Sequence, residues 1–315
     1  MHKSHIAIIG TGAVGASTAF ALTTRNLGSH LTLIDVSKER QEGEVMDLSH
    51  GLTFVETNNI CTGTFRDAAK ADIIIHTAGA AQKPGETRLD LVRKNVEITR
   101  SIFKSVGKIR KDAIILVVSN PVDILTYVTQ EISGLPQSQV FGSGTLLDTS
   151  RLKWSLGQQF HINPSNIHAY MLGEHGDSEF AAYSLANIAG VPLRHFPEYD
   201  PKVLKKIEDQ TKRAAYEIIK RKGATYYAIA LAVTEFVEAI MFNQNAILPT
   251  SVRLNRYRPS GDVTINDVCL GVPAVIGAKG VNKIIRLHLS AAEGKKLKKS
   301  ADVIKKHIRS AFRKS

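Results

Sequence analysis

Short, uniformly apolar runs alternate with longer amphipathic segments along the first half of the chain. The apolar runs lie at Ile6–Ile9, Leu31–Ile34, Ile73–His76, Ile114–Val118 and Val140–Phe141. The segments between them repeat apolar side chains at helical spacing and lie near Val14–Arg25, Lys38–His50, Leu89–Ile109 and Ile124–Ile132. Strands that are apolar on both faces are typical of a parallel sheet covered by helices on either side. Because crossovers between parallel strands are right-handed, the pattern predicts an α/β fold with a doubly wound parallel sheet.

The pattern changes after Leu146, where helices and strands become segregated. Helices are expected over Leu147–Phe160, near Pro201–Arg221 and near Ala224–Phe242. Strand-like runs are expected at Ile167–Met171, Ala246–Val252, Val263–Ile265 and Ala274–Ile276. This order predicts a second domain of mixed α+β type. Since no low-complexity linker separates the halves, we expect domains at 1–145 and 146–315 that share a large interface.

Composition narrows the class of protein. The 315 residues suffice for roughly two domains, and 43% hydrophobic and 22% charged residues are ordinary for a soluble globular chain. No apolar run approaches the roughly 18–20 residues of a membrane span, and Ile6–Ile9 is too short for a signal-peptide core. The cysteines, Cys61 and Cys269, form no CxxC pair and no disulfide framework. We therefore expect a cytoplasmic protein with no membrane partner.

The net charge of +12 is concentrated in the last part of the sequence. Eleven lysines and arginines lie from residue 283 onward, against two acidic residues. The apolar residues of this segment recur at helical spacing and are Leu297, Ala301, Ile304, Ile308 and Phe312. We interpret the charge as the solvated face of an amphipathic helix, with an anionic surface or nucleic acid as the alternative. No nucleic-acid-binding motif accompanies the charge, so we expect no nucleic-acid partner.

A glycine-rich turn, Gly10–Gly15, follows the first predicted strand and opens a helix. Its GxGxxG spacing allows a tight turn, a close approach of a pyrophosphate to the backbone, and close packing of helix on strand. The helix N-terminus offers free N–H groups to phosphates. Asp35, at the end of the second strand, can accept both ribose hydroxyls and would repel a 2′-phosphate. Glycines at this spacing also arise by chance, but in this context the turn predicts NAD rather than NADP.

Three polar residues, Asn120, Asp148 and Arg151, lie at positions where they could contact a ligand. Asn120 follows the apolar run Ile114–Val118, at the strand end where open α/β sheets bind ligands, although Asn-Pro is also an ordinary turn. Asp148 and Arg151 lie three residues apart on one side of a helix, the spacing of a plain surface ion pair.

Two loops carry further candidates. His175 stands between glycines, which let other groups approach its ring, although one histidine among eleven is more often structural. Residues 80–88 form a polar loop that ends in Arg88. This loop is either an ordinary surface loop or a lid that brings the arginine onto a substrate.

Taken in order, these motifs resemble those of the lactate/malate dehydrogenase family. The segments that carry the resemblance are Gly10–Gly15, Asp35, Gln82–Arg88, Ser119–Asp123, Gly144–Arg151, Gly173–Asp177 and Lys222–Tyr227. Each motif alone is weak, but seven in the same order extend over nearly the whole chain. The resemblance implies a Rossmann domain followed by a mixed α+β substrate domain, with NAD as cofactor.

The resemblance also implies roles for single residues in the reduction of pyruvate to L-lactate. His175 would donate and accept the substrate proton, and Asp148 would orient its ring. Arg151 would hold the substrate carboxylate through a two-pronged salt bridge. Arg88 would polarise the carbonyl group, and Asn120 would help to position its oxygen. The remaining residues assigned in this way are Thr225 at the substrate and Gly10, Gly12, Ala13, Val14, Gly15, Asp35, Thr77, Ala78, Gly79, Asn120, Ser143 and Ile229 at the cofactor.

Gln82 carries the expected choice of substrate. Malate dehydrogenases resemble this chain but place an arginine at this position, where it pairs with a second carboxylate. A neutral glutamine would leave that carboxylate poorly compensated, which favours pyruvate over oxaloacetate. Ala81, where lactate dehydrogenases often carry Asn, and Ala228, where Gly is frequent, depart from the pattern. Malate dehydrogenase and another L-2-hydroxy-acid dehydrogenase are therefore the alternatives.

Two more distant interpretations are disfavoured. An NAD-using glycosidase on a similar fold relies on a metal ion, and the sequence shows no Cys/His cluster with ligand spacing, so we expect no metal. A non-catalytic protein on the same fold would have no need of His175, Asp148, Arg151 and Arg88 together.

The resemblance finally implies a homotetramer that acts in glycolysis and has an anion-binding site between its subunits. Many bacterial lactate dehydrogenases bind fructose 1,6-bisphosphate there through an arginine and a histidine. His168 matches the histidine, but Lys153 stands at the arginine position and lacks the planar guanidinium fork. We expect weak activation at best, and an ordinary interface or surface role for both residues is an equally good interpretation.

Overall fold

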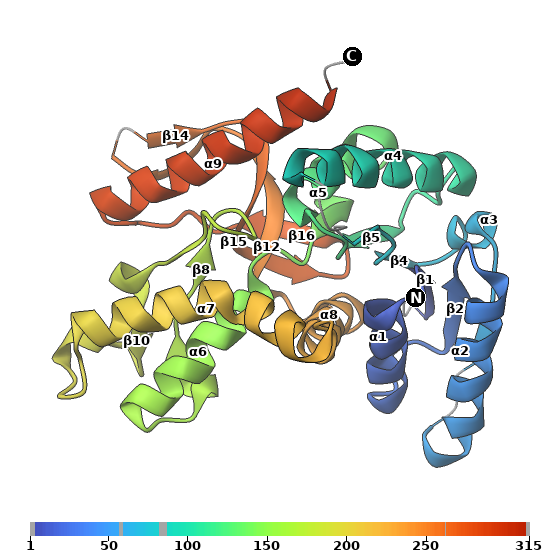
Figure 1. The fold of residues 1–315 in the computed structure, drawn as a ribbon, viewed down its shortest axis with the longest axis horizontal. Coiled ribbons are helices and arrows are strands. Elements are labelled where there is room, and N and C mark those ends of the chain that lie inside the picture. The colour runs from blue at the N-terminus through green and yellow to red at the C-terminus, as the bar shows by residue number, and fades with distance from the viewer. Residues whose placement is uncertain (1–3, 57–58, 82–86, 262, 313–315) are drawn as a thin grey trace.

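A nine-stranded sheet runs through the computed structural model, which describes residues 4–56, 59–81, 87–261 and 263–312 (Figure 1). Its parallel strands are β1 (His5–Ile9), β2 (His30–Ile34), β3 (Asn59–Thr62), β4 (Ile73–His76), β5 (Ile114–Val117) and β6 (Val140–Gly142). They are arranged in the order β3-β2-β1-β4-β5-β6, so the chain winds outward from β1 in both directions. This is the strand order of the Rossmann fold, and it confirms the predicted doubly wound sheet.

Helices join these strands and cover the sheet. They are α1 (Ala13–Thr24), α2 (Lys38–His50), α3 (Phe65–Ala68), α4 (Arg88–Val106) and α5 (Val122–Ile132). Helix α4 packs against α3 and α5, whereas α1 packs against α2 and against α8 (Tyr227–Met241) (Figure 1). Ile8, Ile74 and Ile115, one from each central strand, are fully buried. Burial on both faces is the physical reason that these strands appear in the sequence as uninterrupted apolar runs.

The second half adds helices and extends the same sheet. Its other long helices are α6 (Leu146–Phe160), α7 (Pro201–Lys222) and α9 (Ala291–Phe312). The strands β12 (Ala246–Leu254), β15 (Val268–Gly277) and β16 (Gly280–Ile284) pair with one another in antiparallel fashion. Strand β12 also pairs with β6 through Ser251 and Gly142. The segregated elements of the second half are thus attached edge to edge to the parallel sheet of the first.

A hairpin carries the predicted histidine turn. Strand β8 (Met171–Leu172) pairs with β9 (Phe180–Ala181), whereas β7 (Ile167–His168) pairs with β10 (Asn187–Ile188). The expected single strand Ile167–Met171 is therefore wrong, because its two ends belong to different sheets. The chain changes partner where the Met171 amide donates to Thr149 Oγ1 on α6, at 3.0 Å. The remaining short elements are β11 (Val191–Pro192), β13 (Tyr257–Ser260), β14 (Val263–Ile265) and the 3-10 turns Gly51–Phe54, Gln137–Gln139, Pro164–Asn166, Tyr183–Leu185 and Leu193–His195.

Helix α9 buries one face and leaves its lysines on the other. Leu297, Ala301 and Ile304 are almost completely buried, and Ile308 packs at the margin of the same core. The helix packs against α4, α5 and β15. This arrangement confirms the interpretation of the basic segment as the solvated side of an amphipathic helix.

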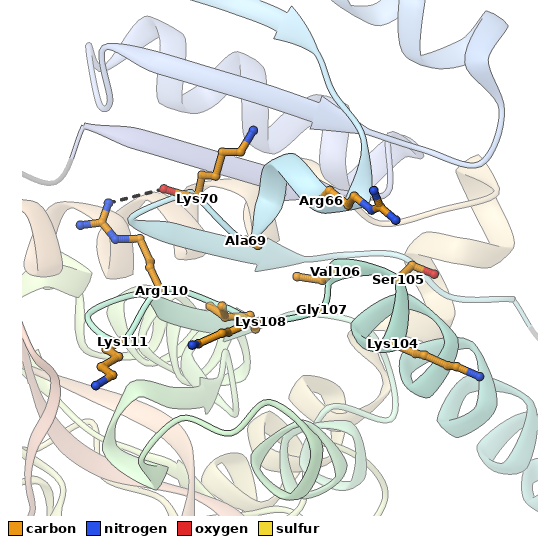
Figure 2. A pocket seen from close by; sticks show the side chains of 11 residues that line it. Arg66, Ala69, Lys70, Lys104, Ser105, Val106, Gly107, Lys108, Arg110 and Lys111 are labelled. Carbon is orange, nitrogen blue, oxygen red and sulfur yellow. Dashed lines mark hydrogen bonds between the residues drawn. The ribbon is translucent and has the colours of Figure 1, made fainter.

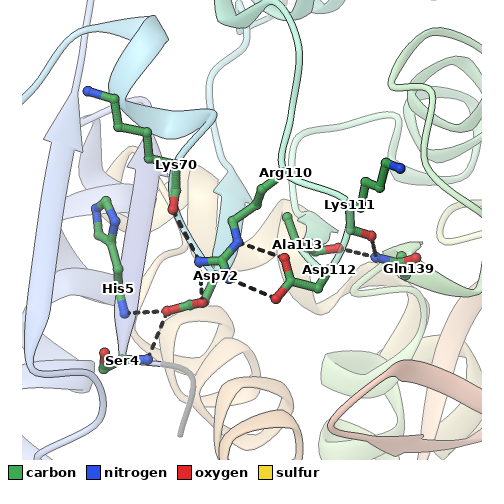
Figure 3. Close-up of polar contacts among 9 residues, drawn as sticks. All are labelled: Ser4, His5, Lys70, Asp72, Arg110, Lys111, Asp112, Ala113 and Gln139. Atoms are coloured by element: carbon green, nitrogen blue, oxygen red, sulfur yellow. Dashed lines mark hydrogen bonds and ion pairs between the residues drawn. The ribbon is translucent and has the colours of Figure 1, made fainter. Parts of the chain in front are cut away.

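A polar cluster around Asp72 joins the amino ends of the central strands (Figure 3). Asp72 Oδ2 accepts hydrogen bonds from the amides of Ser4 and His5, each at 3.0 Å. Its Oδ1 pairs with Arg110 Nη1 at 2.7 Å, and Arg110 Nε pairs with Asp112 at 2.7 Å. The start of β1 is thereby linked to the loop that precedes β5.

A hollow of about 810 Å³ beside this cluster is lined by several cations (Figure 2). They are Arg66, Lys70, Lys104, Lys108, Arg110 and Lys111. Helices α3 and α4 both end here, and cations at helix C-termini are stabilised by the helix dipole without any ligand. The hollow lies at the amino ends of the strands, whereas the glycine turn and Asp35 follow carboxyl ends. Within the described part of the chain, no helix is long and apolar enough to cross a membrane.

Candidate active site

The glycine turn after β1 forms the floor of a cleft. Gly10 adopts a positive φ of 101°, and a Cβ there would lie 2.6 Å from the backbone nitrogen of Ala78. A Cβ on Gly15 would lie 1.8 Å from the carbonyl oxygen of Gly10, so α1 can approach β1 only without a side chain. Gly12 caps α1, and a Cβ there would meet nothing within 4 Å. The open space over Gly12 and the first turn of α1 fits a pyrophosphate.

Asp35 lies across this cleft at the end of β2. Its Oδ2 accepts hydrogen bonds from the amide and hydroxyl of Thr11, at 2.7 and 3.0 Å, and its Oδ1 accepts one from the Ser37 amide at 3.0 Å. Partial burial opposes ionisation, but these donors from Ser37 and Thr11 outweigh it and lower the pKa of Asp35. Asp35 is therefore a fixed anion, which suits hydroxyl donors of a ribose.

Half of the residues predicted for the cofactor line one cavity of about 450 Å³. It is bordered by Gly10, Gly12 and Asp35, and by the Thr77–Gly79 segment that follows β4. Ala13 is exposed at the start of α1, and Val14 is half-buried against the core. The cavity, the glycine turn and the carboxylate together fit a dinucleotide.

His175, Asp148 and Arg151 form a hydrogen-bonded chain. His175 Nδ1 lies 2.6 Å from Asp148 Oδ2, and Arg151 Nη1 lies 2.8 Å from Asp148 Oδ1. The Asp148 side chain is 3% exposed and that of His175 is 25% exposed, so the carboxylate is hidden beneath a ring that solvent can reach. With Nδ1 bound to Asp148, Nε2 is the ring nitrogen available to a ligand.

The charges of this group depend on one another. Burial opposes the charged form of Asp148, but His175 and then Arg151 outweigh burial and hold the Asp148 pKa below its usual value. Burial also opposes the charged form of His175, and the charge and hydrogen bond of Asp148 overcome it and raise the His175 pKa to about 9. The arrangement favours an imidazolium at neutral pH, which is a proton donor.

The turn that carries His175 is held from two sides. The His175 amide donates to Asp123 Oδ2 at 2.8 Å, and Ser251 Oγ donates to Asp123 Oδ1 at 2.5 Å. The Glu174 amide donates to Ser300 Oγ on α9 at 2.7 Å. Burial raises the pKa of Asp123 to about 7, although the Ser251 hydroxyl and the His175 amide both favour its charged form. Helices α5 and α9 thus fix the backbone on either side of Gly173–His175.

The remaining predicted residues lie around this group in different ways. Asn120 follows β5 and is exposed; its carbonyl oxygen accepts a hydrogen bond from Asn95 Nδ2 at 2.8 Å, and its bond to Pro121 is cis. Because Asp123 contacts the His175 amide, the segment from Asn120 onward lies beside the histidine turn. Ser143 is buried after β6, and its amide donates to the Val117 carbonyl at 2.8 Å.

The start of α8, which follows the α7–α8 connection, lies at the cavity that Arg151 lines. Thr225 is half-buried in this connection, and Ile229 is half-buried on α8. Ala228 and Arg151 line the same cavity of about 1040 Å³. Thr225 therefore lies in the segment next to the predicted carboxylate-binding arginine.

Two predicted residues cannot be placed by their side chains. Gln82 lies outside the described residues. Arg88 is the first residue of α4, whose N-cap is Thr87, and its side chain is likewise outside the description.

The predicted effector residues line one cavity. Lys153 and His168 both border a space of about 640 Å³, together with Glu235. Burial lowers the pKa of Lys153. Glu235 pairs with Arg25 at 2.7 Å, so its charge is compensated within the chain.

Sequence reasoning missed three residues of the site. Glu179 is 2% exposed beside Asp148, Ser251 holds Asp123, and Ser300 holds the histidine turn. Glu179 stands four residues after His175 in the same turn, a signal that the sequence does contain. Ser251 and Ser300 are distant in sequence from every motif, and no local pattern marks them.

Comparisons with known proteins agree over the full length. Residues 4–142 match the NAD-binding domain of lactate/malate dehydrogenases, and residues 145–315 match their alpha/beta C-terminal domain. An L-lactate dehydrogenase from Clostridium botulinum (strain 657 / Type Ba4) is 48% identical over 98% of this chain and 98% of its own. The L-lactate dehydrogenase 1 of Clostridium acetobutylicum is 49% identical over 98% and 99%.

Solved structures show the same likeness. A lactate dehydrogenase from a Medee basin deep-sea metagenome library has a TM-score of 0.94 and 41% identity, covering 99% of this chain and 100% of that one. The minor L-lactate dehydrogenase of Enterococcus mundtii has a TM-score of 0.93 and 41% identity, covering 99% of both chains. The chain belongs to the lactate/malate dehydrogenase family.

Proposed function

We propose that this protein is an NAD-dependent L-lactate dehydrogenase that reversibly reduces pyruvate to L-lactate. The observation that carries the proposal is the hydrogen-bonded group of His175, Asp148 and Arg151. The relatives that this protein resembles over nearly their whole length are L-lactate dehydrogenases. A proton donor and a carboxylate-binding cation side by side are what a 2-oxo acid requires.

The residues divide the work as follows. NADH, when bound, supplies the hydride that is added to C2 of the substrate. His175 holds a proton at Nε2 and gives it to the substrate oxygen, while Asp148 keeps Nδ1–H in place. Arg151 uses Nη1 for Asp148, and we assign its other N–H groups to the substrate carboxylate. Thr225, on the connection beside Arg151, lines the substrate.

Four further roles are proposed from the sequence. Arg88 polarises the carbonyl oxygen and Asn120 helps to position it. Gln82 selects pyruvate over oxaloacetate, because it offers no positive charge to a second carboxylate. Ser143 and Ile229 line the nicotinamide end of the cofactor cleft.

The larger organisation is also a proposal. We assign 1–145 to the cofactor domain and 146–315 to the substrate domain, and we expect a cytoplasmic homotetramer. Lys153 and His168, which border one cavity, are the candidate contacts for fructose 1,6-bisphosphate.

A direct assay tests the function. NADH oxidation is followed with pyruvate and with oxaloacetate side by side, using the wild type and His175→Asn. We expect the wild type to prefer pyruvate, and His175→Asn to lose turnover while still binding NADH. Preference for oxaloacetate would make the protein a malate dehydrogenase, and parallel loss of NADH binding in the variant would give His175 a structural role instead.

A further inference from the structure

A second carboxyl group lies buried against the His175–Asp148 pair. Glu179 follows the turn that carries His175 and is 2% exposed. A carboxyl oxygen of Glu179, a carboxyl oxygen of Asp148 and a ring nitrogen of His175 all lie within 4.8 Å of one another. The reaction proposed above gives Glu179 nothing to do, so its position needs a separate explanation.

Two carboxylates so close in a buried site cannot both be ionised at low cost. Of the two carboxyl groups, Asp148 is the one that carries the negative charge, because it accepts hydrogen bonds from His175 Nδ1–H and from Arg151 Nη1. Glu179 Oε2 is buried and accepts no hydrogen bond from any residue that the structure describes. An oxygen without a donor is satisfied if it carries the proton itself, and the neighbouring Asp148 carboxylate is the acceptor that such a proton would face.

The charged groups that face Glu179 support this assignment. Asp148 of α6 and His175 of the same turn are its nearest charged neighbours, and Lys212 of α7 is the remaining cation that acts on it. Lys212 Nζ lies 3.3 Å from Glu208, so its charge is already compensated. Burial, followed by the charge of Asp148, raises the pKa of Glu179 well above its usual value.

We infer that Glu179 is a positioning residue that stays protonated and donates a hydrogen bond to Asp148. This hydrogen bond limits how strongly the Asp148 carboxylate stabilises the protonated ring of His175. The inference rests on the proposed role of His175 as proton donor. A third donor on Asp148 spreads its negative charge, so the imidazolium gives up its proton more readily. Without that donor, Asp148 interacts with His175 and Arg151 only, and we expect the pKa of His175 to rise.

The test compares two substitutions at one position. Glu179→Gln keeps a neutral donor of the same shape, and Glu179→Leu removes the donor while filling similar volume. For Glu179→Gln we expect kcat/KM for pyruvate within about twofold of the wild type and an unshifted pH profile. For Glu179→Leu we expect the alkaline limb of the profile to move upward by about half a unit or more, with NADH affinity unchanged. Glu217→Gln, an exposed carboxyl change on α7, is the matched control.

Infrared spectroscopy reads the proton directly. The C=O stretch of the protonated Glu179 carboxyl should be present in the wild type at neutral pH, lost in Glu179→Gln and kept in Glu217→Gln. It should therefore appear in the wild-type-minus-Glu179→Gln difference spectrum, in which the contribution of Asp123, whose pKa is about 7, cancels. An unchanged carboxyl band in Glu179→Gln would overturn the inference, as would equal pH shifts in both Glu179 variants or none in Glu179→Leu. Should Glu179→Leu fail to fold, the band and the Glu179→Gln profile decide the question.

The two proposals fail separately. If the wild type does not reduce pyruvate, the proposed function is wrong, while the infrared band still reports whether Glu179 is protonated. If pyruvate is reduced and the infrared band of the protonated Glu179 carboxyl is absent, the proposed role of Glu179 is wrong and the proposed function stands.

Discussion

We expect the protonation state of His175 to decide which of the two substrates, pyruvate or lactate, the enzyme can turn over. The pKa of His175 is raised to about 9 by Asp148, so the imidazolium persists through neutral pH. Reduction of pyruvate requires the protonated ring, and oxidation of lactate requires the neutral one. We expect kcat/KM for pyruvate to stay level up to about pH 9 and fall above it, and kcat/KM for lactate to rise over the same range. Profiles that both break near the ordinary histidine pKa would show that Asp148 does not act on the ring in this way.

We expect Asp35 to set the preference for NADH over NADPH at the other end of the cleft. Its charge is fixed by donors from Thr11 and Ser37, so a 2′-phosphate placed beside it is repelled. Asp35→Ala should weaken NADH binding and narrow the gap between NADH and NADPH, because the repulsion is lost. The ratio of the two dissociation constants measures this. An unchanged ratio would show that Asp35 does not bind the ribose of the cofactor.

A substitution at Gln82 tests the expected preference for pyruvate over oxaloacetate. Gln82→Arg supplies a cation for a second carboxylate, so activity on oxaloacetate should rise relative to pyruvate. We expect the ratio of kcat/KM values to shift by at least about tenfold, roughly 1.4 kcal/mol. A smaller shift would mean that residue 82 does not face the substrate.

At the scale of the element, α9 supports the histidine turn from behind. Ser300 is fully buried, accepts the Glu174 amide at 2.7 Å and lies 2.9 Å from Ser178 Oγ. Ser300→Ala leaves a buried N–H without its partner, which costs about 1–3 kcal/mol. We expect a lower free energy of unfolding and a lower kcat with unchanged NADH affinity.

The control for this change lies on the same helix. Ser310 bonds to the Lys306 carbonyl at an exposed site, so Ser310→Ala should change neither quantity by more than a few tenths of a kcal/mol. If the two serine variants behave alike, the contact between Ser300 and the turn does not support catalysis.

The elements also show how far sequence patterns reach. The central strands are predicted well, because burial on both faces leaves continuous apolar runs. Strand β3 was missed, since it lies at the edge of the sheet with half of its side chains exposed, and α3 is one turn long and too short for a period. The junction of β12 with β6 rests on one residue pair, Ser251 and Gly142, which no local pattern announces.

The site residues, like the helices and strands, divide into those that the sequence pattern indicates and those that it does not. His175 and Asp35 lie at a turn and a strand end, where glycine spacing and topology draw attention to them, and Asp148 lies in the first turn of α6, three residues before Arg151. Glu179 and Ser300 act through tertiary contacts that appear only when the hairpin, α6 and α9 are packed together. The catalytic and binding roles of all these residues stay predictions until they are measured.

At the scale of the whole molecule, we expect any regulation by a phosphorylated sugar to act through the cavity that Lys153 and His168 share. Lysine offers charge without the paired donors of arginine, and Glu235 adds a carboxylate to the same cavity. We expect basal activity without any sugar phosphate and at most weak activation by millimolar fructose 1,6-bisphosphate. Pyruvate saturation curves with and without the effector, for the wild type and Lys153→Ala, decide this. Strict dependence on the effector would contradict the expectation, and activation that survives in Lys153→Ala would place the site elsewhere.

The bond between Ser300 and the Glu174 amide has a consequence for how activity is acquired during synthesis. A ribosome makes the glycine turn and Asp35 early, and domains fold as they emerge. The hydroxyl beneath the histidine turn is translated only with α9. A nascent chain that has not reached α9 therefore lacks this support of the histidine turn, and we expect proton transfer to begin only once α9 has packed against the rest of the protein.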